Sequence, residues 1–98
     1  MSKEKTAEQV REQVLSHLRH LASYWSSLPD QTPIERCEGM AFSMLTMIDG
    51  CSSLPSFDLV VRPHPDDKQF HIDEGEDYYA DGQVINGDVH LHDLFFKQ

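Results

Sequence analysis

Apolar residues recur at intervals of three and four in the first part of the chain. Charged and polar residues separate them. The members of this apolar stripe are Ala7, Val10, Val14, Leu18, Leu21, Trp25 and Leu28. Such spacing winds one apolar face along an amphipathic helix, which we predict over residues 5–28. The helix is expected to end at Leu28, because a residue that precedes a proline is disfavoured in the helical conformation.

A second helix is predicted from Thr32 to Gly50. Thr32 can cap it, Pro33 suits the first helical position, and Glu35 completes a capping box. Gly50 can take the left-handed conformation that ends a helix. Its apolar residues again recur every three or four positions: Ile34, Cys37, Ala41, Met44, Ile48 and Cys51. With further apolar residues beside this stripe, we expect a core helix whose second half, residues 40–48, is covered on nearly all sides.

The short connection between the two helices favours an antiparallel helical hairpin. After Cys51 the pattern changes to alternation, and residues 57–62 predict a β-strand that Pro63 closes. Its apolar side chains are expected to face the core helix; they are Phe57, Leu59 and Val61.

Shorter strands are predicted at residues 70–72 and 83–85. The pattern of residues 88–97 fits a strand or a helix, and we expect a short C-terminal helix. The expected fold class is therefore α+β. It has two layers, with the helical hairpin packed on a small and mostly antiparallel sheet.

The length of 98 residues predicts a single domain over residues 1–98. The formal net charge is −9, and residues 50–98 hold 10 acidic against 3 basic residues. This balance disfavours direct binding of nucleic acid, which requires a basic surface. The N-terminal residues lack the apolar segment of a signal peptide, and two cysteines form no disulfide framework, so we expect a cytoplasmic protein.

Four segments resemble a small family of bacterial and phage proteins: RCEGMAFSMLTMIDG, LPSFDLVVRPHPDDKQFH, EGEDYY and DVHLHDLF. The resemblance covers residues 35–96. That family has no assigned activity. The resemblance implies a two-layer α+β fold and a phage or mobile-element setting, and it carries over no functional residue.

Aromatic residues and carboxylates gather in the acidic part of the chain. Such a surface can bind a basic protein partner, since aromatic rings supply contact area and carboxylates steer the approach. The predicted partner-binding residues are Asp73, Glu74, Glu76, Asp77, Tyr78 and Tyr79. Alternatively, the tyrosine rings pack on the sheet and only their hydroxyls reach water. The first interpretation predicts a non-catalytic, cytoplasmic protein-binding module.

The histidines suggest a second hypothesis, a regulatory protein that binds a divalent metal. His90 and His92 would point the same way on a strand and could bind zinc, with His64 or His71 as a third ligand. The sequence contains neither a C-x-x-C pair nor an H-E-x-x-H motif. No cofactor is predicted.

A third hypothesis is a small hydrolase whose site the sequence does not reveal. Cys37 lies in the core stripe, where burial makes a thiol inert, and nothing in the sequence places a base near Cys51. No catalytic residue is therefore predicted. Leu15 and Tyr24 lie off the stripe of the first helix, so they are candidates for a homodimer contact through this helix.

Overall fold

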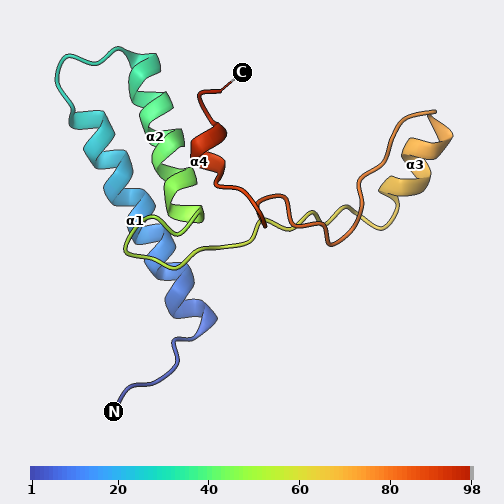
Figure 1. Cartoon of the computed structure of the whole chain (residues 1–98), viewed down its shortest axis with the longest axis horizontal. Helices are drawn as coiled ribbons and strands as arrows, with labels where there is room; N and C mark the ends of the chain where they lie inside the picture. Colours follow the sequence, from blue (N-terminus) through green and yellow to red (C-terminus); the bar gives the residue numbers. More distant parts are fainter. Residues whose placement is uncertain (98) are drawn as a thin grey trace. The chain divides into compact units, whose positions relative to one another are not determined.

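The computed structural model describes residues 1–97, which divide into two compact units. The first comprises Met1–Ser56 and the C-terminal residues from His90, and the second is Phe57–Val89. The helices are α1 (Ala7–Ser27), α2 (Pro33–Ile48), α3 (Asp67–Asp73) and α4 (Leu91–Leu94) (Figure 1). A single domain over residues 1–98 stays a prediction, for which one cooperative unfolding transition of the whole chain would be the test.

Both long helices begin with a capping box. The Thr6 hydroxyl accepts a hydrogen bond from the backbone N–H of Gln9, at 3.1 Å, and the Gln9 side chain accepts one from the N–H of Thr6, at 2.9 Å. Thr32 and Glu35 repeat this arrangement at 3.2 and 2.8 Å. Gly50 has φ 82°, the left-handed conformation expected of it. The sequence therefore placed both helices within two residues of their observed ends.

Helices α1 and α2 pack as the predicted antiparallel hairpin (Figure 1). The indole of Trp25 lies directly over Gly39, where a Cβ atom would overlap the ring. Its Nε1–H donates to the hydroxyl of Ser43 at 2.9 Å, and the Arg36 guanidinium donates to the carbonyl of Leu28 at 2.8 Å. The interface is thus built around one large ring seated on two small residues.

Residues 40–48, the part of α2 predicted to be covered on nearly all sides, include no exposed residue, whereas the first half of the apolar stripe does. Among residues 1–97, Met47 is the only buried hydrophobic residue. Ile34 is 63% exposed and Cys37 is exposed as well. Gly39 lies on the side of α2 that meets α1. Because a helix has about 3.6 residues per turn, Ile34 and Cys37 lie on the opposite side. The apolar stripe and the packed face therefore do not coincide along the first half of the helix.

The predicted α+β fold is wrong, because residues 1–97 contain no sheet and only one β-bridge, between Val60 and Val84. The segments around this bridge exchange backbone hydrogen bonds of 2.8 to 3.0 Å. Beyond these backbone hydrogen bonds, the side-chain amide of Asn86 is the partner: it accepts from the N–H of Leu59 and donates to the carbonyl of Phe57. A side chain that replaces the backbone as partner ends the pairing of the two segments.

The predicted strand at residues 70–72 lies instead in α3, within the second unit. A run of three apolar or aromatic residues is too short for its period to separate strand from helix. The helix fits the local charges, since Asp67 lies in its first turn and His71 in its last. With this segment helical, the two paired segments lack a third strand, and a two-stranded pair is marginal by itself.

The predicted C-terminal helix is present as α4. No helix in the described part of the chain combines the length and the hydrophobicity needed to cross a membrane.

The contact between Trp25 and Gly39 yields a first prediction. Gly39→Ala should destabilise the protein by about 1–3 kcal/mol through overpacking, although alanine is the better helix former. Gly87→Ala is the matched control, because its new methyl group would meet only Val84, at 3.7 Å. Urea unfolding followed by circular dichroism measures both. A Gly39→Ala variant as stable as the wild type would contradict the packing described here.

Candidate metal centre

Asp49 joins two helices that are remote in the sequence. It is the C-terminal cap of α2, and its side chain is only 1% exposed. Its carboxylate accepts hydrogen bonds from the backbone N–H groups of Leu91, at 3.0 Å, and His92, at 2.8 Å. These are donors of the first turn of α4, which otherwise have no partner within their own helix. One carboxylate therefore attaches the C-terminal segment to the end of α2.

The same carboxylate orients the imidazole of His92, whose Nδ1 lies 2.6 Å from Asp49 Oδ2. Burial raises the pKa of Asp49, but the hydrogen bonds from His92 and Leu91 outweigh burial and hold that pKa below its usual value. The carboxylate is therefore ionised and can only accept, so Nδ1 must be the donor. In a neutral ring this leaves the lone pair on Nε2 free to bind a metal.

Three metal-ligating side chains converge beside this contact. Cys51, His90 and His92 each offer a ligand atom, and the three atoms lie within 4.8 Å of one another. Cys51 follows the left-handed Gly50 at the end of α2, and both histidines lie at the start of α4. The two imidazole rings are stacked, with centroids 5.5 Å apart and planes 21° apart. All three residues belong to the first unit.

An aromatic group packs against one side of the cluster. The ring of Phe42 on α2 meets His92 edge-on, at 5.6 Å between centroids, and stacks with Phe96 at 5.7 Å. The His92 side chain is consequently only 16% exposed, whereas Cys51 and His90 are exposed. The cluster is therefore supported from one side and open to an ion from solvent on the other.

Thiolate and imidazole are ligands that zinc prefers, at about 2.3 Å from sulfur and about 2.0–2.1 Å from nitrogen. The ligands of one tetrahedral zinc lie about 3.3–3.6 Å apart, so the ligand atoms of Cys51, His90 and His92, now within 4.8 Å of one another, would have to draw closer around an ion. A carboxylate on the second nitrogen of a ligating histidine, as Asp49 provides for His92, is the usual support of a zinc site. The arrangement fits a transition metal both in its ligands and in their support.

The structure brings His90 and His92 together, as the metal hypothesis expected, but at the start of a helix and not on a strand. It supplies Cys51 as third ligand in place of His64 or His71. Those two histidines belong to the second unit. His64 lies 3.7 Å from Asp66, and His71 lies 3.8 Å from Glu76.

Sequence reasoning missed two features of this site. The first is Asp49, although an acidic residue at the C-terminal end of a helix, where the dipole disfavours it, is a signal that it has another partner. The second concerns Cys51: nothing in the sequence places a base near it, yet two imidazoles lie beside it. Cys37 was expected to be buried and inert, and it is exposed.

The predicted partner-binding residues lie in the second unit, at and after the end of α3. Asp73 is the last residue of that helix, and Glu74, Glu76 and Asp77 are exposed. Tyr78 and Tyr79 are 49% and 65% exposed. With no sheet among the described residues, the alternative that these rings pack on one is wrong.

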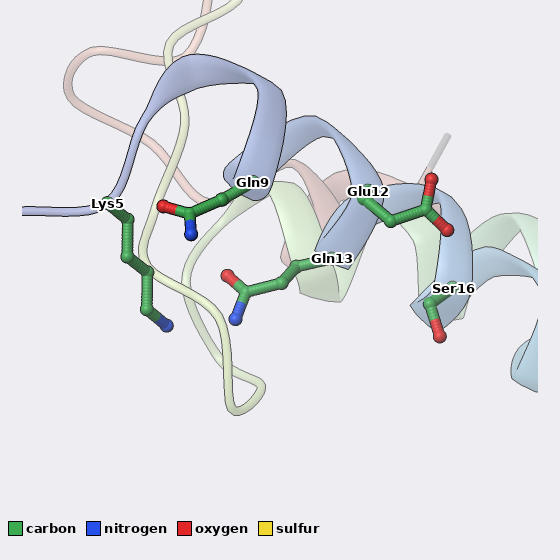
Figure 2. Close-up of a pocket in the computed structure, with 5 residues that line it drawn as sticks. All are labelled: Lys5, Gln9, Glu12, Gln13 and Ser16. Carbon is green, nitrogen blue, oxygen red and sulfur yellow. The ribbon is translucent and has the colours of Figure 1, made fainter.

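A depression of about 460 Å³ lies along the first half of α1, and Figure 2 shows the five side chains that line it. The side chains of Lys5, Gln9 and Gln13 point toward one another across it, and Glu12 and Ser16 lie farther along the helix. All five lining residues come from one helix and the residues just before it. A depression built on one helix surface encloses little of a ligand, so it makes a poorer candidate than the cysteine and histidine cluster.

Comparison of the chain with models of protein families, with curated proteins and with solved structures found no match. The resemblance to a family of bacterial and phage proteins therefore stays a prediction.

The role of Asp49 yields a second prediction. Asp49→Asn should destabilise the first unit by about 1–3 kcal/mol, because an amide carries one acceptor oxygen where the carboxylate serves three donors. The exposed Asp81→Asn is the control. Thermal unfolding measures the loss, and hydrogen exchange at Leu91 and His92 should accelerate in Asp49→Asn only. Equal stability of the two variants would contradict the role assigned to Asp49.

Proposed function

We propose that the protein is a non-catalytic metal-binding protein, in which Cys51, His90 and His92 hold a divalent transition metal. The observation that supports this most directly is the convergence of three ligand atoms within 4.8 Å of one another, next to a buried carboxylate that orients one of the rings. In this proposal the metal fastens the C-terminal segment to the end of α2.

The construction of the first unit explains why such a metal would matter. The two N–H groups that Asp49 binds lie 42 and 43 positions after it in the sequence. The unfolded chain therefore loses considerable conformational entropy when these groups are brought to Asp49. Only one hydrophobic residue in the described chain is buried to offset that loss. A metal that binds only the folded arrangement adds its binding free energy to the stability of the fold.

The same residues also suggest a thiol enzyme, since Cys51, His92 and Asp49 follow the order nucleophile, base and orienting carboxylate. Two features favour metal. A second imidazole, His90, lies in the cluster, where a triad needs only one. A thiol hydrolase also needs donors directed at a developing oxyanion, and the N–H groups of Leu91 and His92 are already bonded to Asp49.

A zinc titration tests the proposal and constitutes the third prediction. At zinc concentrations about 100 times Kd, the thermal midpoint of metal-free wild type should rise by roughly 10 °C or more. Cys51→Ser, His90→Ala and His92→Ala should each lose most of this rise. Cys37→Ser and His64→Ala are matched controls, because each alters an exposed residue of the same type outside the cluster.

If zinc does not raise the thermal midpoint of the wild type, the metal proposal is refuted. It is also refuted if Cys37→Ser loses as much of this rise as Cys51→Ser does. The thiol-enzyme alternative makes a different prediction for metal-free protein. Alkylation of Cys51 by iodoacetamide should then be much faster than that of Cys37 and should slow on Asp49→Asn substitution.

The exposed aromatic residues of the second unit support a second function, binding of a basic protein partner. Phe70 is 58% exposed, in addition to Tyr78 and Tyr79, and all three stand among exposed carboxylates. Lys68 lies over the ring of Tyr78, at 5.0 Å from its centroid, and a basic partner would make contacts of the same kind with the other rings. We propose the cytoplasm as the setting. Self-association through α1 remains a further proposal, and the exposed Leu15 and Tyr24 are consistent with it.

Charge neutralisation tests this second function and is the fourth prediction. Replacing Asp73, Glu74, Glu76 and Asp77 together by Asn or Gln should leave thermal stability unchanged or slightly higher, because exposed like charges repel. Binding to a basic probe, polylysine, should weaken and lose much of its salt dependence. A control neutralises four exposed acids of the first unit: Glu4, Glu8, Asp30 and Glu38. If both variants bind the probe equally, the effect is one of net charge, and residues 73–79 have no special role.

A further inference from the structure

Asp93 lies beside both histidines of the cluster, in the first turn of α4. One of its carboxylate oxygens is 3.3 Å from Nε2 of His92, and the other is 3.7 Å from Nδ1 of His90. The Nε2 atom of His92 is the nitrogen that remains free once Nδ1 donates to Asp49. The carboxylate of Asp93 thus stands next to the lone pair through which His92 would bind a metal.

The 3.3 Å between Asp93 Oδ1 and His92 Nε2 suits two ligands of one ion better than a hydrogen bond. The 3.7 Å to His90 involves the other oxygen, so the carboxylate must turn to bind through one atom. Two ligand atoms at about 2.0–2.1 Å from a tetrahedral metal lie about 3.3 Å apart. Hydrogen bonds between nitrogen and oxygen are usually shorter, about 2.7–3.2 Å, and a separation of 3.7 Å is not one. Asp93 is also 61% exposed, so its carboxylate is free to turn toward an ion.

The backbone explains how such near neighbours can converge. Positions two apart in a regular helix point in different directions, but His90 is the N-terminal cap of α4, with φ −95° and ψ 118°, and is not helical. This extended conformation brings its ring onto that of His92, and Asp93 follows His90 by three positions, close to one helical turn. One turn of chain therefore carries all three side chains. The group within 4.8 Å of Cys51 comprises the two histidines, so the Asp93 carboxylate must turn toward Cys51 to join them.

From these observations we infer that Asp93 is the fourth ligand, completing a closed Cys51–His90–His92–Asp93 zinc site. This inference rests on the metal-binding function proposed above. A thiolate and a carboxylate together balance the charge of one divalent ion. Four protein ligands leave no position for an activated water, which is the property of a structural and not a hydrolytic zinc site. The mixture of sulfur, nitrogen and oxygen ligands also favours zinc or cobalt over copper(I), which prefers sulfur.

Cobalt(II) substitution in the full-length protein tests the inference. The wild type should give the intense visible absorption of tetrahedral cobalt together with thiolate-to-cobalt charge transfer. Added azide should leave this spectrum unchanged, because no position is open. Asp93→Ala should open that position, so that the visible bands weaken and azide then alters them. Its zinc affinity should fall at least about tenfold.

Asp93→Asn and Asp88→Asn form a matched pair, since each removes one exposed carboxylate within three positions of His90 in the sequence. The first should lose zinc affinity and the second should not, and Asp93→Glu should recover part of it. Circular dichroism of each variant checks that the helices persist. If wild-type cobalt protein binds azide, or if the matched pair bind zinc equally, Asp93 is not a ligand, although the three-ligand site stands. If the wild type binds neither zinc nor cobalt, the proposed function itself fails.

Discussion

The buried carboxylate of Asp49 is the constraint on which the rest of the first unit depends. It ends α2, accepts the first N–H groups of α4 and fixes the tautomer of His92. Burying an ionised carboxylate that is only 1% exposed costs much free energy unless both of its oxygens accept hydrogen bonds. These hydrogen bonds bring His90 and His92 to the side of Cys51. The structural role of Asp49 and the candidate metal centre therefore have the same physical origin.

Stability in this protein comes from a few specific contacts and not from a large core. In the described chain Met47 alone among hydrophobic residues is buried, and the hairpin depends on the ring of Trp25 seated on Gly39 and bonded to Ser43. A small domain with so little buried surface usually requires a disulfide, a metal or a partner. Both cysteines are free thiols here. This makes a metal at Cys51 and a partner on the exposed aromatic surface physically reasonable additions.

The proposed metal centre and the acidic aromatic surface belong to different units, and each can be altered without touching the other. In the first unit the ligands come from two segments that a metal would join. In the second unit exposed rings such as Tyr79 stand among carboxylates that outnumber the basic side chains of residues 57–89. A basic partner would supply both the missing charge and the missing contact area.

The sequence by itself determined the elements whose signals are local. Thr32, Pro33 and Glu35 start α2 and Gly50 ends it through contacts within a few residues, so these bounds were predictable. Residues 70–72 were misassigned because their short apolar run fits strand and helix alike, and the choice depended on the surrounding turn. Only the tertiary structure decided that Gly39, and not the apolar stripe, faces α1, because the size of the opposing Trp25 ring sets that contact. It likewise decided the candidate metal centre, since no spacing along the chain relates Asp49 and Cys51 to histidines some forty positions away.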